Sequence, residues 1–228
     1  VAKSINAREL WRLILETRHE TGEPYLHFVD TSNKSLPETQ KKLGLSVKQS
    51  NLCSEITLPT DEDRTAVCCL SSVNLAEYDE WSTSPTFIPD MIRMLDNVLE
   101  HFIMATYNFS YDYKGNILDM KVKEEMSGFE KSGYSAYRER SVGLGAMGFH
   151  AYLQKNGIPF ESLGAQATNL EMFAHIKSES DITTRKLAQE KGACPDDDSC
   201  EVRNAHLLAI APNASSSIIC GNTSPSIE

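Results

Sequence analysis

The stretch Ser50-Asn51-Leu52-Cys53-Ser54-Glu55 sets an amide, a thiol and a carboxylate at alternate positions of one short segment. In an extended chain successive side chains point to opposite faces, so Asn51, Cys53 and Glu55 are expected to share one face. The stretch therefore predicts a small volume in which three different chemical groups meet.

The composition around this stretch indicates a globular protein. The chain has 228 residues with 40% hydrophobic content, and no evident linker divides it, so residues 1–228 are expected to form a single unit. The formal net charge is −10 and the basic residues are scattered, which argues against binding nucleic acid through its phosphates. No run approaches the roughly 20 apolar residues that span a bilayer, and the start lacks a signal-peptide core, so we expect no membrane partner and a cytosolic location.

Six cysteines occur in the chain, and no two of them form a C-x-x-C pair. A chain of this size does not need a disulfide framework, and in a reducing cytosol most of the cysteines are expected to be free thiols. Because the usual spacing of structural zinc ligands is absent, no metal site is predicted. A cysteine-based metal-binding module stays open as an alternative function.

Hydrophobic periodicity predicts where the regular elements lie. Apolar residues at helical spacing predict helices at residues 7–20, 88–107 and 170–190. Short apolar or β-forming runs predict strands at residues 25–29, 65–75 and 205–211, the second with Cys68 on one face. Stretches without a clear period predict loops at residues 30–48 and 107–133, the latter with a short helix. Helices that alternate with short strands indicate an α/β fold.

Two further motifs are rich in small residues. Residues 141–149 have glycines spaced like a dinucleotide-binding turn, but residues 137–141 are charged rather than strand-like, so close packing of helices is the favoured interpretation. In residues 212–217, small hydroxyl side chains follow a predicted strand at a predicted helix start, where free backbone N–H groups bind anions. For this second motif an anion site and a plain helix cap are both open interpretations.

Four stretches of the chain, in this order, resemble the large catalytic subunit of class I ribonucleotide reductase, in the form carried by T-even-like bacteriophages. They are SNLCSEITLP at residues 50–59, CCLSSVNL at 68–75, GACP at 192–195 and PNASSS at 212–217, and the resemblance extends over the whole chain. It implies a ten-stranded α/β barrel made of two half-sheets, with the radical cysteine on a central finger loop. This chain would supply that loop and part of the second half-barrel.

The resemblance also implies an activity, the reduction of ribonucleoside diphosphates to 2′-deoxyribonucleoside diphosphates by a protein thiyl radical. Cys53 would hold the radical and take the hydrogen from the ribose 3′ carbon, and Glu55 would take the proton of the 3′-hydroxyl. Asn51 would bind the substrate hydroxyls, and Cys68 would be one member of the thiol pair that reduces the 2′ position. The substrate would contact two segments of the chain, Ser50, Asn51, Leu52, Cys53 and Glu55 in the first, and Pro212, Asn213, Ala214, Ser215 and Ser216 in the second.

The chemistry of these side chains suits the implied roles. A thiol in an apolar site keeps its proton, which hydrogen-atom transfer requires. A carboxylate accepts a proton, and a neutral amide such as Asn51 both donates and accepts hydrogen bonds without competing for that proton.

The resemblance further implies partners. The radical would come from a separate, metal-containing small subunit and the electrons from a thioredoxin- or glutaredoxin-type reductant, and no cofactor would be bound by this chain. The partner of Cys68 would come from upstream sequence, so we expect complementary large-subunit segments, the chain being a split-gene product or a cut piece. If a phage encodes the chain, it would work in the host cytosol. An inert fragment that only completes the barrel is the alternative from a different class.

Overall fold

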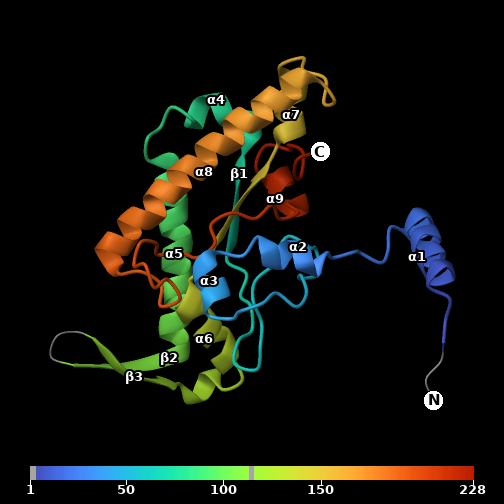
Figure 1. Cartoon of the computed structure of the whole chain (residues 1–228). Coiled ribbons are helices and arrows are strands. Elements are labelled where there is room, and N and C mark those ends of the chain that lie inside the picture. The colour runs from blue at the N-terminus through green and yellow to red at the C-terminus, as the bar shows by residue number, and fades with distance from the viewer. Residues whose placement is uncertain (1–3, 113–115) are drawn as a thin grey trace.

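A parallel pair of strands lies at the centre of the fold in the computed structural model, which describes residues 4–112 and 116–228 (Figure 1). Strand β1 (Leu70–Asn74) pairs with β4 (Gly143–Met147) in the register Leu70↔Gly143 to Asn74↔Met147. A single parallel bridge, Leu144↔Leu208, adds the 206–209 segment on the other side of β4. The described residues thus contain part of a parallel α/β sheet and no closed barrel.

The glycine-rich stretch forms strand β4, so the expectation that it packs helices together was wrong. Its small residues do serve close packing, but between strands. A Cβ atom at Gly145 would collide with the carbonyl oxygen of Ala209, and one at Gly143 with the side chain of Leu70. Because these Cβ atoms are absent, β4 lies close to the 206–209 segment, and the N–H of Leu144 donates to the carbonyl oxygen of Leu207 at 2.8 Å. The strand expected at residues 205–211 is confirmed only at this bridge.

Two long helices pack against each other beside the strands, with α5 in contact with β1 and β4, and Figure 1 shows α8 crossing over α5. Helix α5 (Phe87–Thr106) confirms the helix predicted at residues 88–107, and its apolar stripe is buried at Ile88, Ile92, Leu95, Leu99 and Ile103. Helix α8 (Leu163–Lys191) confirms the helix predicted at residues 170–190 but begins earlier. It begins there because Ser162 caps it, with the Ser162 hydroxyl oxygen accepting the N–H of Ala165 at 3.1 Å.

The region before the site loop contains two short helices, α2 (Val29–Lys34) and α3 (Glu38–Lys42). The strand predicted at residues 25–29 was therefore wrong, and the loop predicted at 30–48 contains most of these two helices. The side chain of Asn33 organises this region, because its Nδ2 donates to the carbonyl oxygens of Val29 and Val47 and its Oδ1 accepts from the N–H of Val47, all at 2.9 Å. Those hydrogen bonds give the backbone an alternative to a sheet ladder.

Strand β1 is shorter than the strand predicted at residues 65–75, and the loop predicted at 107–133 contains an antiparallel hairpin of β2 (Tyr107–Tyr111) and β3 (Ile117–Val122). In Figure 1 this hairpin projects from the body of the protein. The remaining short elements are η1 (Leu75–Glu77), α4 (Tyr78–Trp81), η2 (Glu124–Met126), α6 (Glu130–Glu139), α7 (Phe149–Lys155) and α9 (Ala214–Ile219).

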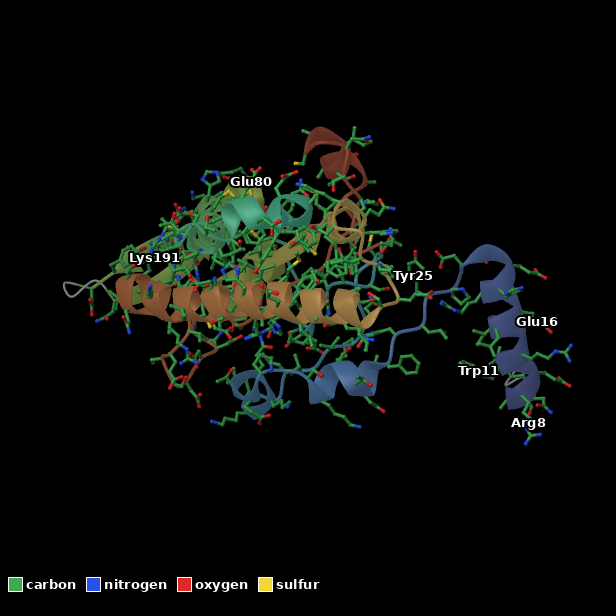
Figure 2. All side chains as sticks on the ribbon, turned by 90° about the horizontal axis from the view of Figure 1, so that it is seen from above. Arg8, Trp11, Glu16, Tyr25, Glu80 and Lys191 are labelled. Atoms are coloured by element: carbon green, nitrogen blue, oxygen red, sulfur yellow. The ribbon has the colours of Figure 1, made fainter. Side chains whose placement is uncertain are left out.

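Helix α1 (Ala7–Thr21) confirms the first predicted helix and stands apart from the other elements, as Figures 1 and 2 show from two directions. Asn6 caps it by accepting the N–H of Arg8 at 2.9 Å. None of its residues is buried, and Trp11 is 49% exposed. Within residues 4–112 and 116–228, no helix combines the length and the apolar character needed to cross a membrane.

Candidate functional site

Residues 51–56 form a tight closed loop rather than an extended strand. The N–H of Asn51 donates to the carbonyl oxygen of Ile56 at 3.2 Å, and the N–H of Ile56 donates back to Oδ1 of Asn51 at 3.0 Å. Ser54 adopts a left-handed backbone with φ of 67°, which reverses the chain. The extended geometry expected for this stretch was wrong, because the Asn51 side chain satisfies backbone groups that a strand would have paired.

The loop nevertheless brings together two of the three expected side chains. Nδ2 of Asn51 donates to Oε2 of Glu55 at 2.7 Å, and both residues are half-buried. Cys53 lies at the turn between them and is exposed, as is Leu52. The expectation of an apolar environment for the Cys53 thiol is therefore not met within the part of the chain that the structure describes.

Cys68 lies beside this loop and borders a pocket of about 50 Å³. The pocket is lined by four segments of the chain, residues 55–58, 67–70, 141–143 and 206–209 without Leu207. Cys68 is exposed, but partial desolvation by the pocket raises the pKa of its thiol, and the nearby Glu55 and Cys53 raise it further, so the thiol is protonated at neutral pH. The structure thus brings Asn51, Cys53, Glu55 and Cys68 into one neighbourhood.

The neighbouring cysteine, Cys69, has a different environment. It is buried, and its Sγ donates to the carbonyl oxygen of Leu95 at 3.4 Å. Burial also raises the pKa of Cys69. All six cysteines are free thiols in the structure.

A buried polar network lies behind this pocket, and no motif in the sequence predicted it. Glu139 accepts hydrogen bonds from Ser135 Oγ at 2.8 Å, Ser141 Oγ at 3.0 Å and Gln40 Nε2 at 3.2 Å. Oε1 of Gln40 lies 2.9 Å from Nε2 of His206, and both Ser141 and His206 line the pocket. A histidine within the apolar run 205–211 is the one local feature of the sequence that marks this network.

Burial determines the charges in the network. It raises the pKa of Glu139, although the three hydrogen bonds and nearby Arg64 act in the opposite direction. Burial also lowers the pKa of His206 to about 4, so its imidazole is neutral at pH 7.

The second candidate segment, residues 212–216, lies outside the pocket, which ends three positions earlier at Ala209. As expected, a helix begins here, with Ala214 as the first residue of α9. Pro212, Ala214, Ser215 and Ser216 are exposed, and Asn213 donates from Nδ2 to the carbonyl oxygen of Ala211 at 2.7 Å instead of capping the helix. Among the described residues, the N–H groups of positions 214–216 have no hydrogen-bond partner.

Within residues 4–112 and 116–228, no group of three or more His, Cys, Asp or Glu side chains is arranged to hold a metal ion.

The chain matches one protein family over most of its length. Residues 1–201 match the family described as "Ribonucleotide reductase, barrel domain". The chain is 47% identical to the ribonucleoside-diphosphate reductase large subunit of Invertebrate iridescent virus 3, over 100% of this chain and 33% of that protein. It is 48% identical to a putative large subunit of Frog virus 3 (isolate Goorha), over 100% of this chain and 37% of that protein.

A solved structure shows the same relationship. The class Id ribonucleotide reductase alpha subunit of Actinobacillus ureae superimposes with a TM-score of 0.86 at 35% identity, over 97% of this chain and 39% of that one. The chain thus spans about a third of the length of the two viral relatives.

Proposed function

The chain belongs to the ribonucleotide reductase barrel-domain family, and we propose that it is the catalytic-core segment of a large subunit that reduces ribonucleoside diphosphates to 2′-deoxyribonucleoside diphosphates. The observation that carries this proposal is the convergence of Asn51, Cys53, Glu55 and Cys68 on one loop and the adjoining pocket. An inert scaffold needs none of these four side chains in one place.

In the proposed mechanism, Cys53 holds the thiyl radical and takes the 3′ hydrogen atom of the ribose. Glu55 takes the proton of the 3′-hydroxyl, and the hydrogen bond from Asn51 at 2.7 Å holds its carboxylate in position. The protonated Cys68 thiol and a second thiol then supply two electrons and two protons, so that hydrogen replaces the 2′ oxygen, the oxygen leaves as water and the two thiols form a disulfide. Cys53 returns the hydrogen atom to the 3′ carbon, which regenerates the thiyl radical. In this proposal Ser50 and Leu52 complete the loop's contact surface for the substrate.

We propose that residues 212–216 bind the diphosphate. The support is the set of exposed backbone N–H groups at the start of α9, since such groups bind phosphate oxygens without a basic side chain. This agrees with the net charge of −10, which leaves backbone amides as the suitable ligands for an anion.

The remaining proposals concern partners. The chain spans about a third of its viral relatives, so we propose that turnover requires the other segments of the large subunit, a small subunit that generates the radical, and a thioredoxin- or glutaredoxin-type reductant. A reducing cytosol suits the six free thiols. The T-even-like phage type and the split-subunit origin of the chain stay predictions. Without those other segments, the purified chain is expected not to reduce CDP, and measurable turnover would contradict this dependence.

The test of the proposed function is Cys53→Ser in the assembled enzyme. Because serine has nearly the shape of cysteine but cannot hold the radical, dCDP formation is expected to disappear while CDP binding stays within twofold of the unmodified protein. The matched control is Cys200→Ser, an exposed cysteine away from the pocket, which should retain full turnover. Product formation by the Cys53 variant would refute the proposal.

A further inference from the structure

The polar network behind the Cys68 pocket has no role in the mechanism above. It consists of Glu139, Gln40 and His206, which come from α6, α3 and the segment beside β4. We propose that His206 is a positioning residue, held in one tautomer by the Glu139–Gln40 pair so that its Nδ1 accepts a hydrogen bond from water bound in the pocket beside Glu55 and Cys68. The consequence for catalysis rests on the proposed function, whereas the tautomer and the water do not.

Glu139 determines the orientation of the Gln40 amide. Glu139 is surrounded by groups that donate to it, the hydroxyls of Ser135 and Ser141, with the positive charge of Arg64 nearby. Burial raises the pKa of Glu139, but these donors and Arg64 favour its ionised form. An ionised carboxylate accepts only, so it faces the NH₂ end of Gln40, whose Nε2 lies 3.2 Å from Oε2 of Glu139. The opposite orientation would place two acceptors against each other.

The orientation of Gln40 in turn determines the tautomer of His206. Once the NH₂ end of Gln40 faces Glu139, its carbonyl oxygen faces Nε2 of His206 at 2.9 Å. A carbonyl oxygen accepts only, so Nε2 must carry the hydrogen atom. Since the imidazole is neutral at pH 7, Nδ1 is left with an unshared electron pair. Gln40 is completely buried, which keeps solvent water from offering it other partners.

Nδ1 of His206 can accept a hydrogen bond from water. Among residues 4–112 and 116–228, no side chain or backbone group donates to it. His206 borders two hollows, a wide surface groove of about 630 Å³ between α3 and α8 and the Cys68 pocket. The Cys68 pocket has a volume of about 50 Å³, enough for ordered water, which needs roughly 10–15 Å³, but too small for a nucleotide. The same pocket is lined by Glu55, Cys68 and Ser141, so a water molecule there has several polar groups around it.

Water at this place fits the proposed reaction. When the ribose is reduced, the bond between the 2′ carbon and its oxygen breaks, the thiol pair supplies two electrons and two protons, and the oxygen leaves as water while the disulfide forms. A neutral acceptor can hold such a molecule near Cys68 without taking the thiol proton, which a charged base in its place would do.

Two measurements test the inference without reference to activity. Nitrogen-15 NMR of the whole chain labelled at histidine should show His206 with hydrogen on Nε2 down to about pH 5. A crystal structure should show water 2.7–3.2 Å from Nδ1. Hydrogen on Nδ1, a mixture of tautomers or an empty pocket would each overturn the inference. His175, whose Nδ1 lies 3.1 Å from the Tyr78 hydroxyl, is the internal control.

Variants separate the positioning role from a general effect on folding. Glu139→Gln replaces the acceptor that orients Gln40, so the His206 signals should change to a mixture of tautomers while those of His175 stay unchanged. In the assembled enzyme, His206→Leu should lower kcat about tenfold, the rate equivalent of one hydrogen bond, with the KM for CDP unchanged. His206→Gln, which keeps an acceptor, should recover most of this loss, and equal rates for the two variants would refute the role in catalysis.

These outcomes distinguish the inference from the proposed function. If the assembled enzyme shows no reductase activity at all, the proposed function fails, and the NMR and crystallographic results still decide whether His206 is held in one tautomer beside bound water.

Discussion

Asp96, in the middle of α5, is a buried charge that joins α5 to the end of α8 and to residues 140, 203 and 204. Its side chain is fully buried, and its carboxylate accepts from Arg140 Nη2 at 2.9 Å, Lys191 Nζ at 3.0 Å, Asn204 Nδ2 at 3.2 Å and Arg203 Nε at 3.3 Å. We predict that Asp96→Asn strongly destabilises the protein, because it removes the charge that neutralises two buried guanidinium groups.

The magnitude follows from burial. The side chains of Arg140 and Arg203 are 4% and 9% exposed, and without Asp96 the anion that still contacts both is Glu100, whose side chain is 40% exposed. Removing one partner of a buried ion pair costs about 3–5 kcal/mol, because the other charge stays buried without compensation. We therefore expect the free energy of unfolding to fall by about 3–5 kcal/mol, a large part of the 5–15 kcal/mol typical of a domain.

The assay is urea denaturation of the two matched variants. The control is Glu190→Gln, which breaks the Arg93–Glu190 pair between the same two helices, with an N–O distance of 2.6 Å and side chains 39% and 48% exposed. Solvent screens an exposed pair, so this variant should lose much less stability. Equal losses for Asp96→Asn and Glu190→Gln would refute the reasoning that burial decides the effect.

The same carboxylate gives a pH dependence. Burial opposes ionisation of Asp96, but Arg140 and Arg203 outweigh it, and the pKa of Asp96 lies below its usual value. A lowered pKa in the folded state contributes stability that is fully present above the unfolded pKa, about 3.9 for Asp, and is lost as the pH falls through the folded pKa. The stability difference between the unmodified protein and Asp96→Asn should therefore stay constant from pH 8 to about pH 5 and shrink below about pH 4.

Two further predictions concern packing and thiol reactivity. Gly145→Ala should lower the free energy of unfolding by about 1–3 kcal/mol in urea denaturation, because its methyl group would push the carbonyl of Ala209 away from β4. The control is Gly164→Ala, whose new methyl group meets side-chain atoms at 3.3 Å or more. This variant should change stability by less than about 0.5 kcal/mol. Burial raises the pKa of Cys194 to about 11, so at pH 8 Cys194 should react with iodoacetamide roughly 100-fold more slowly than exposed Cys200. Mass spectrometry measures the labelling of each cysteine, and equal labelling would contradict this prediction.

The long helices could be predicted from the sequence because each has many residues that report the same period. In α5, five buried apolar side chains repeat at helical spacing, and in α1 the cap Asn6 and the C-terminal Gly22, with φ of 81°, mark both ends. These signals are local, so no knowledge of the tertiary contacts was needed.

Strand β4 and the hairpin could not be predicted, because their signals depend on partners far away in the chain. Gly143 to Met147 shows no apolar alternation, since β4 is buried on both faces and small residues are required there by residues 207–209. In the hairpin, β3 (Ile117–Val122) is mostly exposed and contains charged residues, so its strand character comes from pairing with β2.

The candidate site likewise has one part that short motifs predicted and one part that depends on contacts between residues far apart in the chain. Asn51, Glu55 and Cys68 were identified from short motifs, and the structure brings them together, although through a turn that the alternation of side chains had not predicted. The His206–Gln40 contact joins residues separated by 166 positions, so no pattern within either segment could indicate it.

The structure also shows why the site loop has a fixed base and an exposed tip. Beyond the loop, buried Arg64 anchors the chain by two hydrogen bonds to Asp196, at 2.5 and 3.0 Å, and lies 5.5 Å from the ring of Tyr134. Before Cys68 the chain is thus held to the body by a bidentate ion pair, whereas Leu52 at the tip is 85% exposed. A base fixed in this way lets Asn51 and Glu55 keep their geometry while Cys53 is presented outward, which is where the proposed radical must arrive from another part of the enzyme.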